Sequence, residues 1–131
     1  MVQNEFNLTL PIYYTLERVK GNKVMLVGLN NYRNWHHSIS NKIKHHYSDI
    51  VGEIVGDRKF KKIKVKYIVY ARRVGTDGPN IRSVIEKFFL DGLVNCGAIK
   101  DDSIQYVVAD SSEYFIDREN PRIVINISEA K

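Results

Sequence analysis

Alternation at a period of two over positions 62–70 constrains the fold more than any other feature of this sequence. A period of two predicts a β-strand with one buried face. The apolar members on that face are Ile63, Val65, Tyr67 and Val69. A turn-rich loop follows, and apolar residues then recur every three or four positions over 80–96, which predicts a helix that ends at Gly97.

The rest of the chain predicts further strands and one more long helix. We expect a strand over 5–10 that Pro11 ends, a hairpin from 13–19 and 23–27, and two late strands over 104–109 and 122–127. A helix over 31–51 is predicted by an apolar stripe, interpreted as core, made of Trp35, Ile39, Ile43, Tyr47 and Ile50. The predicted class is α+β: one domain over 1–131, with a mixed sheet of four or five strands and two main helices.

Composition limits the functional classes. The chain has 131 residues, of which 44% are hydrophobic, so one core is expected and disorder over the whole length is excluded. A single cysteine, Cys96, excludes an internal disulfide framework and a cysteine-clustered zinc site. Without an apolar run of about 18 to 20 residues or a leader pattern, a soluble, cytoplasmic protein with no membrane partner is expected. The formal charge of +5 suggests a polyanionic partner.

Acidic residues around the second predicted helix carry the clearest chemical signal. Lys87 and Asp91 fall within about 40° of each other on the helical wheel, while Asp77 precedes the helix and Asp101 and Asp102 follow it. A return strand could bring these carboxylates together as oxygen ligands for Mg²⁺ in phosphodiester hydrolysis, with a lysine stabilising negative charge. The structural alternative is a turn aspartate, a helical i,i+4 pair and a solvated acidic turn.

Three segments, 77–80, 87–93 and 97–102, together resemble the RusA-type Holliday-junction resolvases of phages, prophages and bacteria. The family pattern is an Asp-x-Asp-Asn loop, a helix with Lys-x-x-x-Asp-x-Leu, a glycine-containing turn and a closing Asp-Asp. Two departures are Pro79 in place of the second loop aspartate, and a helix longer by four residues before Lys87.

The resemblance implies a homodimeric endonuclease that uses Mg²⁺, with Mn²⁺ as a possible substitute, and cuts branched, four-way DNA by paired nicks in recombination, repair or phage DNA processing. It implies catalytic roles for Asp77, Lys87, Asp91 and Asp102. The implied metal ligands are Asp77, Asp91, Asp101 and Asp102.

Basic residues precede and flank this acidic group. The expected DNA contacts are Lys62, Lys64, Lys66, Arg72 and Arg73, with Lys42 and Lys44 on the first predicted helix as further candidates. An ordinary solvated sheet face is the alternative. Four histidines in the first helix lack a metal-ligand spacing. Two other functions stay open: a non-catalytic DNA-binding module in which Pro79 reflects lost metal binding, and a basic protein-interaction domain.

Overall fold

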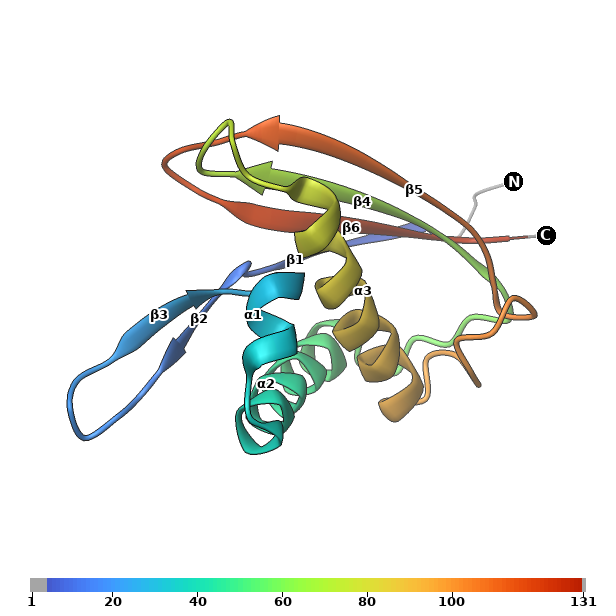
Figure 1. Cartoon of the computed structure of the whole chain (residues 1–131). Helices are drawn as coiled ribbons and strands as arrows, with labels where there is room; N and C mark the ends of the chain where they lie inside the picture. The colour runs from blue at the N-terminus through green and yellow to red at the C-terminus, as the bar shows by residue number, and fades with distance from the viewer. Residues whose placement is uncertain (1–4, 131) are drawn as a thin grey trace.

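Strand β4 (Ile63–Ala71) lies in the middle of the fold, as its alternating sequence predicts. The structure is a computed structural model that describes residues 5–130. Its elements follow the chain in this order: β1 (Glu5–Leu10), β2 (Tyr13–Leu16), β3 (Lys23–Leu26), α1 (Leu29–Asn34), α2 (His37–Val55), β4, α3 (Gly78–Asn95), β5 (Val107–Ile116) and β6 (Arg122–Glu129). The fold is α+β, as predicted, and its main helices and strands share one hydrophobic core (Figure 1).

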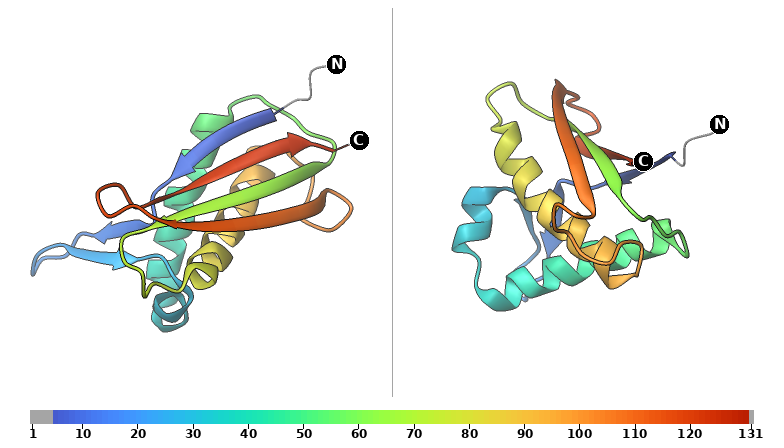
Figure 2. Two further views of the ribbon diagram at one scale, coloured as in Figure 1. Left: turned by 90° about the horizontal axis from the view of Figure 1, so that it is seen from above. Right: turned by 90° about the vertical axis from the view of Figure 1, so that its right-hand side faces the viewer.

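The main sheet has four strands in the order β1-β6-β4-β5. β4 and β5 are parallel, because α3 carries the chain back across the sheet between them, whereas β6 is antiparallel to both β1 and β4. β1 and β5 therefore form the two edges (Figure 2). The short strands β2 and β3 form a separate hairpin that projects to one side (Figure 1).

The helices cover one face of the sheet, and the core lies between the two layers (Figures 1 and 2). The predicted face of β4 is fully buried there. Tyr47 of α2 stacks on Phe88 of α3, with ring centroids 5.6 Å apart. The helices approach closely at Gly92, where a Cβ would lie 2.9 Å from Cβ of Val51. No helix among residues 5–130 covers the other face of the sheet (Figure 2).

The predicted ends of two elements were wrong. The helix expected over 31–51 is two helices, because Trp35 has an extended backbone and the ring of His36 accepts a hydrogen bond from the Ser38 N–H, which begins α2. That helix continues to Val55, which is buried. The strand expected over 104–109 begins at Val107 and continues to Ile116, since the polar residues in its middle conceal the alternation.

The other predicted elements are confirmed with small shifts in their ends: the first strand, the hairpin, the long helix and the last strand. Gly97 follows the long helix with a positive φ of 82°, which suits glycine at a helix end. No helix within residues 5–130 is long and apolar enough to cross a membrane.

Candidate functional site

Asp77 begins α3. One of its carboxylate oxygens accepts a hydrogen bond from the backbone N–H of Asn80 at 3.3 Å, and the other accepts from the Asn80 side chain at 2.8 Å. Pro79 lies in the first turn, where its missing N–H costs nothing. Asp77 is exposed and lines a pocket of about 400 Å³ with Asn30 and Asn31, which we call the Asp77 pocket. Its carboxylate is thus both a helix cap and accessible to solvent.

Asp101 and Asp102 lie in an exposed turn beyond the other end of α3. The backbone N–H of Phe60 donates to the Ala98 carbonyl at 2.8 Å, so this turn is tied to the segment before β4. A pocket of about 490 Å³ opens beside it, and we call it the lysine pocket. Its cationic lining residues are Lys59, Lys61 and Lys100. Sequence reasoning missed these lysines, although the basic run over 58–62 was a visible signal.

The expected gathering of carboxylates does not occur within one chain. α3 has 18 residues, so Asp77 and the Asp101–Asp102 turn are separated by about 27 Å of helix at about 1.5 Å per residue. A Mg²⁺ ion holds its oxygen ligands at about 2.0 to 2.1 Å and cannot bridge that length. Among residues 5–130, no three His, Cys, Asp or Glu side chains are grouped so that they could hold a metal ion.

Lys87 and Asp91 lie between these two ends and contact the other helices. The Lys87 ammonium donates to the Tyr32 hydroxyl of α1 at 2.9 Å. This hydrogen bond, with the nearby charge of Asp91, raises the pKa of Lys87. Asp91 forms an ion pair with Lys44 of α2 at 3.6 Å. Lys44, an expected DNA contact, therefore neutralises an expected metal ligand.

The expected DNA-binding cations do not form one surface. Lys64 and Lys66 extend from β4 on the face opposite its buried residues, and Lys66 pairs with Glu113 of β5 at 2.8 Å. Lys62 lies just before this strand, and Arg72 and Arg73 follow it in the loop that leads to Asp77. The guanidinium carbon of Arg72 lies 5.4 Å from the ring centroid of Tyr13 in β2. Lys42 and Lys44 instead belong to the helix layer on the other side of the sheet.

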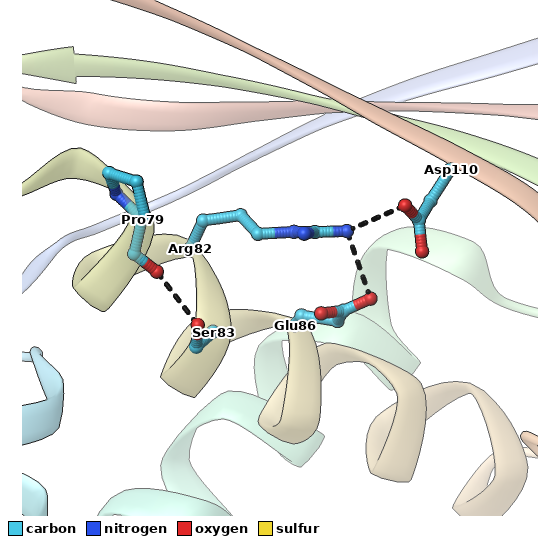
Figure 3. Close-up of polar contacts among 5 residues, drawn as sticks. All are labelled: Pro79, Arg82, Ser83, Glu86 and Asp110. Atoms are coloured by element: carbon cyan, nitrogen blue, oxygen red, sulfur yellow. Dashed lines mark hydrogen bonds and ion pairs between the residues drawn. The ribbon is translucent and has the colours of Figure 1, made fainter.

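A polar cluster between α3 and β5 was not anticipated. Figure 3 shows the Arg82 guanidinium between two carboxylates, 3.2 Å from Glu86 and 3.0 Å from Asp110. Partial burial raises the pKa of Glu86, and the charge of Asp110 raises it further, while Arg82 opposes the shift. The guanidinium carbon also lies 4.8 Å from the ring centroid of Tyr67. The i,i+4 spacing of Arg82 and Glu86 was the available sequence signal.

Three buried polar atoms in or beside this cluster have no hydrogen-bond partner among the described residues: the Tyr67 hydroxyl, the Arg82 Nε and the Ser112 hydroxyl. Tyr67 and Ser112 face each other in the β4–β5 register. The cluster therefore attaches β5 to α3 through polar groups as well as through apolar contact.

Comparison with known proteins adds no relative: no protein-family model matches the sequence, and no curated protein matches it.

Proposed function

We propose that this protein is a Mg²⁺-dependent endonuclease that resolves four-way DNA junctions by paired nicking, as a homodimer. The observation that carries the proposal is that exposed carboxylates share a loop or a turn with cationic residues at both ends of α3. Asp77 follows Arg72 and Arg73 in one loop, and the Asp101–Asp102 turn adjoins the lysine pocket. Cations beside a carboxylate suit a phosphate backbone that must come close to an acidic group.

Carboxylate oxygens are the ligands that Mg²⁺ prefers, so the donor set fits the metal. Each end of α3 offers only one or two of them, and the helix keeps the ends apart. A second copy is therefore needed to combine the Asp77 end of one protomer with the Asp101–Asp102 turn of the other. Once bound, the metal would polarise the scissile phosphate and lower the pKa of an attacking water.

Cationic side chains would stabilise negative charge on the phosphate and contact the DNA backbone. The Tyr32 hydroxyl holds the Lys87 ammonium in place and raises its pKa, which suits a group that stabilises negative charge on a phosphate. Lys59, Lys61 and Lys100 can contact the DNA backbone beside the acidic turn. Such contacts are independent of sequence and weaken as salt rises.

The test is cleavage of a synthetic four-way junction with Mg²⁺ by the full chain and by Asp102→Asn. We expect the variant to lose cleavage by about two orders of magnitude or more, the scale seen when a catalytic group is removed, while junction binding persists. Asp49→Asn is the matched control, because Asp49 is an exposed aspartate of α2 away from both pockets. Equal cleavage by Asp102→Asn and the parent protein would exclude this role for the turn.

A second function is favoured by one observation, the use of Asp77 as a helix cap beside Pro79. A non-catalytic DNA-binding module would keep this aspartate for the fold alone. It predicts junction binding that falls with salt but is unchanged by Mg²⁺ and by Asp102→Asn. Tight binding without cleavage, in Mg²⁺ and in Mn²⁺, would favour this second function over the nuclease.

A further inference from the structure

Strand β5 has a free edge. It pairs with β4 on one side, and no strand within residues 5–130 pairs with the other side. The Asp117 N–H donates to the Ala71 carbonyl of β4 at 2.8 Å. Because backbone groups alternate along a strand, Asp110, Ser112 and Tyr114 direct their N–H and C=O groups away from β4. After the irregular pairing at Val108, residues 109–116 thus present a regular edge with unpaired backbone groups.

This edge lacks two of the usual protections against pairing. Edge strands commonly carry lysine or proline where they would otherwise pair with another chain, and β5 contains neither. It exposes four large apolar side chains, each to between 42% and 48% of its surface: Val108, Tyr114, Phe115 and Ile116. Val74 and Ile104, in the loops that flank the strand ends, are exposed as well. Exposed apolar side chains therefore lie towards both ends of the strand, with the short polar segment 110–113 between them.

The charges of β5 do not prevent it from meeting a copy of itself. Its two acidic residues are each neutralised within the chain, Asp110 by Arg82 and Glu113 by Lys66. A second copy would therefore meet little repulsion, and hydrogen bonds of an antiparallel ladder would satisfy the backbone groups that are now free.

We propose that β5 is the surface through which two copies of this chain associate, as an antiparallel pair centred on Ser112. In this register, Val108 of one copy lies opposite Ile116 of the other, and Asp110 lies opposite Tyr114. Ser111 lies opposite Glu113, so no two acidic residues meet. A register centred on Glu113 would instead oppose two carboxylates, which destabilises a strand pair.

The pairing also deepens the proposed nuclease function, on which this consequence rests. β5 runs parallel to β4, from the Asp101–Asp102 turn towards the Asp77 end of α3. An antiparallel copy therefore brings its own acidic turn alongside the loop that holds Asp77. Two-fold symmetry repeats the arrangement at the other end of the shared strand pair. A dimer of this kind would have two composite acidic sites, one for each nick.

Disulfide trapping tests the register. We would prepare Ser111→Cys and Glu113→Cys separately, each in a Cys96→Ser background that removes the only native thiol. Residues directly opposite in a non-hydrogen-bonded antiparallel pair have Cα atoms about 4.5 Å apart, within disulfide range. We expect a mixture of the two proteins to form linked dimers under mild oxidation, and either protein alone to form few. Efficient linking of Ser111→Cys alone, or no linking in any sample, would overturn the proposed register.

Sedimentation without DNA or metal tests the surface itself. Ser112→Pro removes an N–H that points away from β4, so it should block association without breaking the β4–β5 ladder. Ser112→Ala, which keeps the N–H, is the matched control and should stay dimeric. A parent protein that sediments as a monomer, or a folded Ser112→Pro dimer, would overturn the proposal.

The two proposals can fail separately. A protein that forms the β5 dimer but never cuts junctions would contradict the nuclease function alone. A nuclease that stays dimeric after Ser112→Pro would contradict the β5 surface alone.

Discussion

The two edges of the sheet are held in different ways. β1 places Leu8 and Leu10 in the hydrophobic core, 4% and 0% exposed, and leaves only polar side chains on its outer face. β5 is longer, yet no residue along it is fully buried. Its inner face carries Asp110 and Ser112, and its contact with α3 depends on the Arg82 cluster.

This difference teaches that a strand can have its backbone paired in a sheet without having its side chains buried in the core. β1 is stabilised by transfer of apolar surface from water, which is the larger contribution in a small domain. β5 is stabilised by its ladder with β4 and by exposed or half-buried ion pairs, each worth little in solvent. We therefore expect β1 to be needed for folding and β5 to be available for association.

Shortening one side chain at each edge of the sheet should give the largest difference in stability. Leu10→Ala removes a fully buried side chain, and we expect it to lower the free energy of unfolding by about 2 to 5 kcal/mol. Phe115→Ala removes a ring that is 48% exposed, so its loss in the monomer should be about 1 kcal/mol or less. Urea denaturation in dilute solution measures both. Equal losses would contradict the distinction between the edges.

A methyl group added at two glycines should distinguish a rigid contact from one whose side chain can move aside. A Cβ on Gly92 would meet the Cβ of Val51 between the two long helices, where neither backbone can move easily. Gly92→Ala should therefore destabilise the protein by about 1 to 3 kcal/mol. A Cβ on Gly78 would meet the ring of Tyr114, but this ring is on the exposed edge and can turn outward. Thermal unfolding should show a smaller loss for Gly78→Ala, and the reverse order would contradict our description of β5.

Removal of the Arg82 charge tests the polar attachment of β5. Arg82→Met leaves Asp110 and Glu86 without their shared cation. Because these carboxylates are partly exposed, we expect a loss of about 1 kcal/mol, smaller than either core change. Hydrogen exchange should report the loss as faster exchange in β5 than in β1. Uniform acceleration across the sheet would contradict a local role for this residue.

The smallest predicted effect is a pH dependence at Glu86. Its pKa is raised in the folded state, chiefly by burial, so the folded protein binds this proton more tightly than the unfolded chain does. The resulting stabilisation is complete below the unfolded pKa and is lost as the pH rises through the folded pKa. Glu86→Gln mimics the protonated form and should equal or exceed the parent protein in stability at pH 7. The advantage should shrink in acid, and a variant that is less stable at neutral pH would contradict this sign.

Much of the fold could be predicted because its signals are local. Alternation identified β4, and the apolar spacing identified α3, whose buried positions match the predicted stripe. The break at Trp35 was missed because an imidazole cap at His36 has no periodic signature. The end of β5 was missed because an edge strand with a polar inner face need not alternate.

The candidate site was less predictable. Residue types and spacing drew attention to the aspartates on both sides of α3. The spacing of residues along the chain does not show where their side chains point in the folded protein. Lys87 and Asp91 were expected beside the other carboxylates, yet contacts with Tyr32 and Lys44 direct them towards the other helices. Lys100 precedes the acidic turn in the sequence, but Lys59 and Lys61 come from a segment about 40 residues earlier, and only the return of the chain to β4 brings them there.

By itself, the sequence determined the α+β class, the central strand and the long helix, since hydrophobic periodicity acts over a few neighbouring residues. Only the tertiary structure decided that α3 keeps its two acidic ends apart and that β5 lies at an open edge of the sheet. The physical reason is that helix length and strand order set distances between residues far apart in the chain, and no local pattern encodes them.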